Sequence, residues 1–143
     1  MKIPFGQTPE DGILTGGQPS ETDFREAAEL GFKTVINLRG VGEPGTDIEP
    51  VLMRELGLQY LHLPINGAGD ITPDNAQKLA DALKDAARPI LLHCASGNRI
   101  GALIALQAGV VDGLEHRAAI EKGRSYGLTR MEPFVQALLQ QMT

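Results

Sequence analysis

The residues that could do chemistry gather in one short stretch, residues 93–101, with the sequence HCASGNRIG. Cys94 is the only cysteine among 143 residues, and it follows the apolar run 89–92 directly. A buried strand, a short glycine-bearing turn and a helix N-terminus form an anion cradle, because free N–H groups and the helix dipole point into one space. The same field favours a thiolate at Cys94. The stretch therefore predicts nucleophilic sulfur chemistry on an anionic substrate.

Arg99 stands five residues after Cys94 and offers a planar cationic fork that suits tetrahedral oxyanions. Each residue also has a plainer interpretation. A lone cysteine is usually a small buried hydrophobe, an arginine can simply pair with a carboxylate, and a histidine at a strand end, such as His93, often satisfies a neighbouring carbonyl. The position of Cys94 between a strand and a glycine turn, in register with Arg99, favours reactivity and anion binding.

Composition places the chain among single-domain globular proteins, and we expect one domain over residues 1–143. Hydrophobic residues make up 42% and charged residues 22%, which is ordinary for a soluble globular protein. No apolar run approaches the roughly 20 residues needed to cross a bilayer, so we expect no membrane partner. A single cysteine cannot form an internal disulfide, and the N-terminus has no apolar segment of signal-peptide length. A cytoplasmic location follows as a prediction, with a removed export signal left open.

Charge and aromatic content argue against nucleic acid as a partner. The chain carries 13 basic and 18 acidic residues, a net charge of −5, and has no tryptophan and no basic stretch. His62 and His116 show no ligand spacing with each other or with Cys94, so we expect no metal site. We also expect no cofactor. The sequence does not indicate an oligomeric state.

Apolar β-branched runs alternate with helical patterns, which predicts parallel strands joined by crossover helices. The fold class is therefore α/β, a three-layer sandwich with a mainly parallel sheet of four to five strands and helices on both faces. We expect strands at 13–15, 34–38, 59–63 and 89–93, and helices at 20–30, 47–56, 72–87, 99–111, 114–125 and 131–142.

Three loops leave the carboxyl ends of the predicted strands, at residues 39–45, 64–70 and 94–99. Ligands of such sheets bind at these strand ends, so the loops should meet at one crevice. Arg39 and Glu43 would then lie near the cysteine loop, either as a structural pair or as support for the site. Asp70, at the end of the second loop, would also come within reach, unless it is a solvated residue or a cap for the next helix.

Three blocks of the chain, residues 15–20, 31–39 and 93–101, resemble the cysteine-dependent phosphatase superfamily, in particular small bacterial dual-specificity-like phosphatases. The likeness is strongest to the beta-lactamase-hydrolase-like phosphatase domains, which occur alone or fused to metallo-β-lactamase-like enzymes. The resemblance implies a phosphotyrosine phosphatase-like fold and a hydrolase that acts on a phosphorylated protein or small molecule.

The resemblance also implies roles for single residues. Cys94 would be the nucleophile that forms a phosphocysteine, Arg99 would hold two non-bridging oxygens, and His93 would tune the thiolate. Asp70 would be the general acid that protonates the leaving oxygen. The anion would be held by the main chain of Ala95, Ser96, Gly97, Asn98 and Arg99.

Two departures from the phosphatase pattern keep alternatives open. The signature has five residues between cysteine and arginine, whereas this chain has four, the loop length of rhodanese-type sulfurtransferases. Ile100 also replaces the Ser or Thr that helps the thiolate depart, unless Ser96 takes that role. A sulfurtransferase with a Cys94 persulfide is therefore one alternative. A weakly active or inactive anion- or phosphoprotein-binding module is the other.

Overall fold

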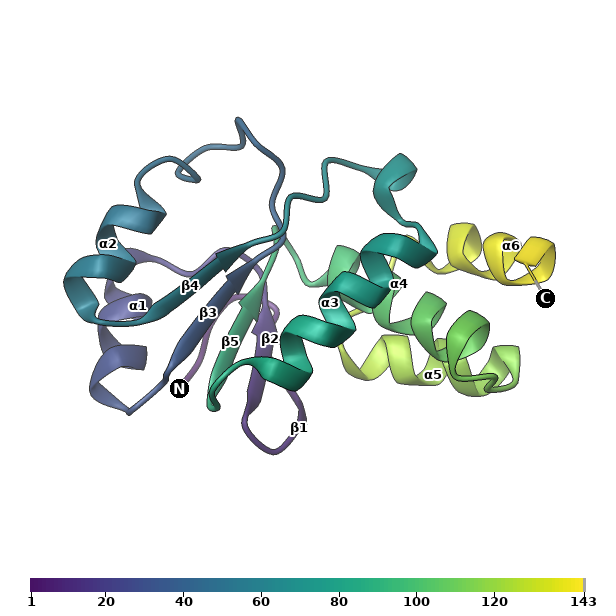
Figure 1. Cartoon of the computed structure of the whole chain (residues 1–143), viewed down its shortest axis with the longest axis horizontal. Coiled ribbons are helices and arrows are strands. Elements are labelled where there is room, and N and C mark those ends of the chain that lie inside the picture. The colour runs from purple at the N-terminus through teal and green to yellow at the C-terminus, as the bar shows by residue number, and fades with distance from the viewer. Residues whose placement is uncertain (143) are drawn as a thin grey trace.

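The computed structural model describes residues 1–142, which contain five strands and six α-helices (Figure 1). A 3₁₀ turn at Ala68–Asp70 and a π-helical turn at Gln107–Val111 complete the regular structure of this part. The strands are β1 Gln7–Glu10, β2 Ile13–Gly16, β3 Thr34–Asn37, β4 Gln59–His62 and β5 Ile90–His93. The α-helices are α1 Glu21–Glu29, α2 Glu49–Leu56, α3 Pro73–Asp85, α4 Asn98–Leu106, α5 His116–Ser125 and α6 Glu132–Met142.

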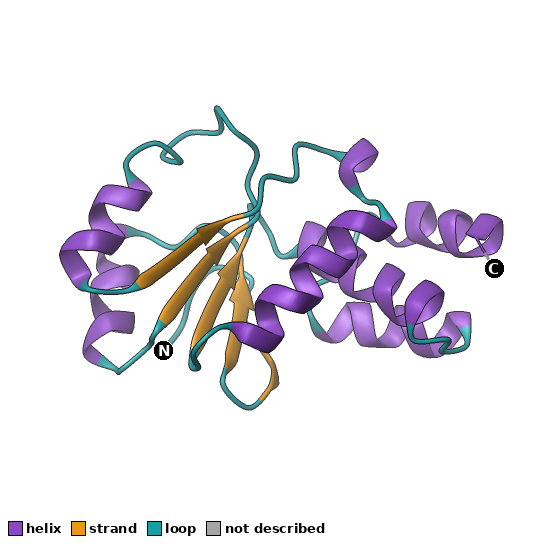
Figure 2. Cartoon of the chain, in the orientation of Figure 1, coloured by secondary structure: helices purple, strands orange, loops and turns teal. Residues whose placement is uncertain are grey.

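The five strands form one sheet in the order β1-β2-β5-β3-β4, with every pair parallel except β1 and β2. Helices α1 and α2 cover one face and α3 to α6 lie on the other (Figure 2). The predicted three-layer α/β sandwich is confirmed. Strand β5 lies between β2 and β3, and His93 at its end is in register with Gly16 and Asn37. The residue after β5 is Cys94, so the fold places the cysteine at the centre of the carboxyl edge.

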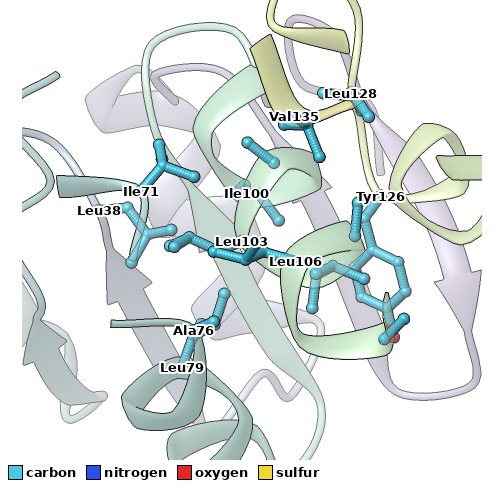
Figure 3. Packing of buried hydrophobic residues seen from close by; sticks show 14 of the residues in the cluster. Leu38, Ile71, Ala76, Leu79, Ile100, Leu103, Leu106, Tyr126, Leu128 and Val135 are labelled. Carbon is cyan, nitrogen blue, oxygen red and sulfur yellow. The ribbon is translucent and has the colours of Figure 1, made fainter. Parts of the chain in front are cut away.

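Alternate residues of the central strands face two separate cores. Ile36 and Leu92 pack with α3 and α4, and this larger core also takes in Ile100 from α4 (Figure 3). Val35 and Leu91 face the other way, toward a smaller core under α1 and α2. Burial on both faces explains why these strands are continuous apolar runs rather than alternating ones.

Two helices, α1 and α3, begin at side-chain caps. The Ser20 hydroxyl accepts a hydrogen bond from the main-chain N–H of Asp23, whose carboxylate accepts from the N–H of Ser20 in return. The Thr72 hydroxyl caps α3 through the N–H of Asn75, with Pro73 as the first helical residue. These local signals place the starts of α1 and α3.

The structure adds two features to the predicted elements. Strand β1 forms a hairpin with β2 through Asp11 and Gly12, and the helix expected over 99–111 ends its last turn as the π-helical segment from Gln107. Within residues 1–142, no helix is long and apolar enough to cross a membrane.

Candidate active site

Cys94 lies at the point where β5 ends and the loop to α4 begins. The residue is fully buried, and its Sγ accepts a hydrogen bond from the main-chain N–H of Gly97 at 3.1 Å. Helix α4 starts at Asn98, directly after this loop, so its positive end lies against the sulfur. A main-chain donor and a helix N-terminus both stabilise negative charge, as a nucleophilic thiolate requires.

Glycines allow the loop to adopt its tight shape. Gly97 has φ of 87°, a left-handed conformation in which a side chain would be strained. Gly17, at the end of β2, forms an isolated bridge with Ser96, and a Cβ at Gly17 would lie 2.4 Å from the carbonyl oxygen of Ala95. The close approach of β2 explains a glycine in the block 15–20 and fixes the first half of the loop.

Arg99 is held by its outer nitrogens in a way that leaves one edge of the guanidinium free. Nη1 donates to Glu43 Oε2 at 2.7 Å and to the carbonyl oxygen of Ile65 at 2.8 Å, and Nη2 donates to Glu43 Oε1 at 2.9 Å. An arginine has five N–H groups, so Nε and the second hydrogen of Nη2 remain, and they share one edge. Among residues 1–142 no acceptor contacts that edge, which has the geometry to hold two oxygens of one oxyanion.

Glu43 gathers donors from two loops around one carboxylate. Besides Arg99, it accepts from Arg39 Nε at 3.3 Å and, over a short distance, from the main-chain N–H of Gly40. The hydrogen bonds from Arg99 are the main reason that the pKa of Glu43 falls to about 2, against the opposing effect of burial. In turn, Glu43 raises the pKa of Arg99, with a smaller contribution from the charge of Cys94. Arg99 thus stays charged within electrostatic reach of the sulfur.

His93, the residue before the cysteine, pairs with Glu49 from the start of α2. Both side chains are buried, and His93 Nε2 lies 2.8 Å from Glu49 Oε2. Because a carboxylate only accepts, Nε2 carries the proton. Burial alone would raise the pKa of Glu49, but the hydrogen bond and charge of His93 outweigh it and lower the pKa. The other ring nitrogen, Nδ1, is buried and has no hydrogen-bond partner in the described part of the chain.

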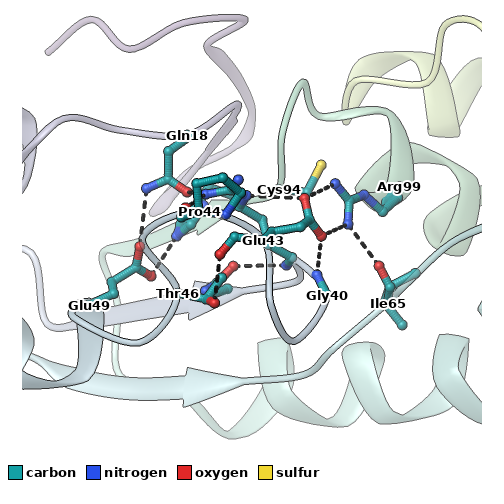
Figure 4. A network of polar contacts seen from close by, with 12 residues as sticks. Gln18, Gly40, Glu43, Pro44, Thr46, Glu49, Ile65, Cys94 and Arg99 are labelled. Atoms are coloured by element: carbon teal, nitrogen blue, oxygen red, sulfur yellow. Dashed lines mark hydrogen bonds and ion pairs between the residues drawn. The ribbon is translucent and has the colours of Figure 1, made fainter.

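Gln18 joins these two groups into one polar chain around the loop (Figure 4). Its Oε1 accepts from Arg39 Nη1 at 2.7 Å, and its Nε2 donates to Glu49 Oε1 at 3.1 Å. The contacts therefore run without a break between the two ends of the cysteine loop. In order, they connect Arg99, Glu43, Arg39, Gln18, Glu49 and His93.

Convergence of the three strand-end loops is confirmed by these contacts, since Arg99 binds both Glu43 and Ile65. Asp70 lies at the C-terminal end of the 3₁₀ turn in the second loop. Its Oδ2 accepts from the main-chain N–H of Asn66 at 2.8 Å, and its carbonyl accepts from the Asn75 side chain at 2.8 Å. The second carboxylate oxygen makes no hydrogen bond within residues 1–142. The structure thus gives Asp70 a part in loop architecture, and its role as general acid stays a prediction.

The remaining loop residues differ in what their side chains do. Asn98 faces away from the cradle, because its Oδ1 accepts from the main-chain N–H groups of Thr129 and Met131 at 2.9 and 3.2 Å. Ile100 is fully buried in the larger core, so the side chain at this position packs in the core. Ala95 is exposed and Ser96 partly so, and the Ser96 hydroxyl has no hydrogen-bond partner among the described residues.

Sequence reasoning missed Gln18 and Glu49. Gln18 lies inside the block 15–20 that carries part of the family resemblance, so a signal for it existed. Glu49 had none, because its importance arises only when α2 packs against the start of the cysteine loop. Across residues 1–142, no group of three or more His, Cys, Asp or Glu side chains is arranged to hold a metal ion.

Comparison with known families finds that residues 11–110 match the phosphatase-like domain of the beta-lactamase hydrolase-like proteins. Beta-lactamase hydrolase-like proteins of Xylella fastidiosa and Agrobacterium fabrum are 36% and 32% identical to the chain over 120 residues. Those residues are 80% of this chain and 27% of either relative. The chain therefore spans about a quarter of the length of the curated relatives it matches.

Solved structures with the same fold are phosphatases or candidate phosphatases. A candidate phosphatase from Neisseria meningitidis matches with a TM-score of 0.80 and 21% identity, covering 99% of this chain and all of that one. The core catalytic domain of the PP-IP phosphatase SIW14 from S. cerevisiae, solved with citrate, matches with a TM-score of 0.74 and 18% identity, covering all of this chain and 89% of that one. At these identities, the structural likeness establishes the fold.

Proposed function

The chain belongs to the phosphatase-like domain family of the beta-lactamase hydrolase-like proteins, and we propose that it hydrolyses phosphoric monoesters through a covalent intermediate on Cys94. Family membership favours a phosphatase over a sulfurtransferase or a binding module. The observation that carries the mechanism is the arrangement of Arg99 near the fully buried Cys94. Glu43 and Ile65 hold one side of the guanidinium, and its other edge is free to bind an anion.

In the first step, the Cys94 thiolate attacks phosphorus, so that the S–P bond forms and the P–O bond to the leaving group breaks. Asp70 gives its proton to the leaving oxygen, and the alcohol or phenol departs. The free N–H groups of Arg99 hold two non-bridging oxygens, and main-chain N–H groups of residues 95–99 face the remaining charge. Donors held in place around the developing charge would lower the barrier without reorganisation.

In the second step, water attacks the phosphocysteine, the P–S bond breaks, and inorganic phosphate and the thiolate are released. Asp70, now ionised, takes the proton from the attacking water. Without a hydroxyl at residue 100, the departing thiolate relies on the N–H of Gly97, 3.1 Å from the sulfur, and on the helix N-terminus. The second step is therefore the slower one in this proposal.

The short loop favours one competing function, sulfur transfer through a Cys94 persulfide, because four intervening residues make a smaller cradle than five.

Purified protein should hydrolyse an aryl phosphate, with activity abolished in Cys94→Ser and strongly reduced in Arg99→Ala. Sulfur transfer from thiosulfate to cyanide without any aryl phosphate turnover would overturn the phosphatase proposal.

A single phosphatase-like domain over residues 1–143, acting in the cytoplasm on an anionic substrate, is the arrangement we propose. The relatives are about three times as long as this chain, and the activity of their remaining length is not part of the proposal.

A further inference from the structure

A groove with a volume of about 480 Å³ lies between α1 and α2, on the sheet face opposite α3. Its apolar lining combines well-buried and exposed side chains. Phe24 is buried, whereas Ile48 at the N-cap of α2 and Val51 within α2 are 68% and 52% exposed. Large aliphatic side chains that line a hollow while facing water are typical of a surface that binds something apolar.

The rim of the groove is acidic. Glu21, Asp47 and Glu55 line it, and the one cation there, Arg25, pairs with Glu21 at 3.0 Å. Asp47 and Glu55 are exposed and have no ion-pair partner in the described part of the chain. Two uncompensated carboxylates beside apolar side chains complement an occupant that is both apolar and basic.

The groove shares residues with the candidate active site. Gln18 and Pro44 line it, and both accept hydrogen bonds from Arg39 Nη1, at 2.7 Å each. Glu49 also borders the groove while binding His93 beside the cysteine. Figure 4 shows Gln18 and Glu49 at one end of the polar network and Arg99 at the other. The groove is therefore connected to the cysteine loop through Gln18 and through the Glu49–His93 pair.

We infer that the groove binds the segment of a phosphoprotein substrate that flanks its phosphorylated residue, taking one large apolar side chain and an adjacent Lys or Arg. The inference rests on the proposed phosphatase function and names its substrate class. An extended chain advances about 3.3 Å per residue, so nearby residues of the same segment can follow the surface from the cradle into the groove. A small molecule with several phosphates would instead meet the carboxylates of Asp47 and Glu55 beside the cradle, which repel it.

Charge reversal in the groove tests the inference. Two phosphopeptides share one phosphorylated core, one with an apolar-basic flank and one with an acidic flank. Wild type should hydrolyse the first with the higher kcat/KM. Asp47→Lys with Glu55→Lys should lower kcat/KM for that peptide about tenfold and leave aryl phosphate hydrolysis unchanged. The matched control is Asp81→Lys with Asp85→Lys, two exposed positions on α3 at the other face of the sheet, which changes the net charge equally.

The binding of an apolar side chain in the groove is tested by Ile48→Ser. Ile48 is the N-cap of α2, where serine is well tolerated. It should raise KM for the apolar-basic peptide and not for the aryl phosphate. Equal kcat/KM for the two peptides in wild type, or equal losses in the groove variant and the α3 control, would overturn the inference. A concentration-dependent dimer dissolved by Ile48→Ser would also overturn it, since a second copy would then fill the groove.

Failure of the phosphatase proposal is a separate outcome. If no phosphate ester is hydrolysed, binding of the same fluorescent phosphopeptides to Cys94→Ser, read by anisotropy, still tests the groove. Tighter binding of the apolar-basic peptide, lost in the Asp47→Lys, Glu55→Lys background, would retain the docking surface without the chemistry. Equal binding of the two peptides would overturn the docking surface as well as the chemistry.

Discussion

Glu43 binds Arg99 along one edge of its guanidinium, with N–O distances of 2.7 and 2.9 Å, and leaves the edge formed by Nε and Nη2 free. Ile65 takes one further N–H, so three of the five donors are occupied and the other two share an edge. The arginine is therefore positioned before any anion arrives, and Glu43 is a support for the fork rather than a competitor for it.

Removing that support should weaken oxyanion binding. Glu43→Ala should raise the inhibition constant of inorganic phosphate or vanadate about tenfold, because Arg99 loses two charge-assisted hydrogen bonds and with them its orientation. Glu43→Gln should have a smaller effect, since its amide oxygen still accepts from one nitrogen. Competitive inhibition of aryl phosphate hydrolysis measures both, with the exposed Asp85→Asn on α3 as control. Tighter binding in Glu43→Ala would show instead that Glu43 blocks the fork.

The same pair should make stability depend on acid pH in a defined window. The pKa of Glu43 is about 2 in the folded chain, well below its ordinary value of 4.5. The stabilisation of the folded chain by ionised Glu43 is complete above about pH 4.5. It is lost as pH falls toward 2, because the unfolded chain binds the proton at a higher pH than the folded chain. Across this window the free energy of unfolding of wild type should fall by on the order of 2 kcal/mol more than that of Glu43→Gln, allowing for the partial exposure of Glu43.

Urea unfolding of the two proteins at several pH values between 2 and 5 measures that difference. The comparison with Glu43→Gln removes the contribution of the other carboxylates, which both proteins share. A gap between the two proteins that is constant across the window would contradict the assignment of the pair as an ionic contact.

Glu49 should matter more for stability than its place on a short helix indicates. Glu49→Ala leaves the Nε2–H of His93 buried and unpaired, which costs about 1–3 kcal/mol. Glu55→Ala, on the same helix but exposed, should change stability by about 0.5 kcal/mol or less. Denaturant unfolding compares the two variants, and similar losses in both would refute a structural role for the Glu49–His93 pair.

Gly17 should be intolerant of a side chain because of what lies above it. In Gly17→Ala the new Cβ would meet the carbonyl oxygen of Ala95 at 2.4 Å, so the loop must shift. Catalytic efficiency should fall about 10- to 100-fold, since misplacement by about 1 Å costs that much. Gly67→Ala is the matched control, with nothing within 4 Å and an extended φ of 176°. Unchanged kcat/KM in Gly17→Ala would show that β2 does not set the loop.

Features that depend on neighbours in sequence could be predicted well. Cys94 and Arg99 share one short loop between a buried strand and a helix, so their proximity follows from local structure. Continuous apolar runs in the sequence predict buried parallel strands, and the parallel order brings the carboxyl ends of these strands together. From this topology alone, Glu43 could be placed near the cysteine loop.

Features that depend on packing between distant elements could not. Glu49 lies 44 residues before His93, and only the position of α2 on the sheet brings them into contact. Strand β1 escaped notice because its residues, Gln7 to Glu10, are mostly exposed and include Pro9, so they lack alternating hydrophobicity. The carboxylate chemistry of Asp70 depends on its distance from a substrate oxygen, which a sequence does not contain.

The most direct test of the central claim is the mass of the intact protein after rapid denaturation during turnover of an aryl phosphate. With no hydroxyl at Ile100 to help the thiolate leave, the phosphocysteine should accumulate. Intact wild type should then gain the mass of one phosphoryl group, which digestion assigns to the peptide containing Cys94, and Cys94→Ser should gain none. Turnover without that adduct, or a single added sulfur on Cys94 after thiosulfate together with no phosphoryl adduct, would contradict the account.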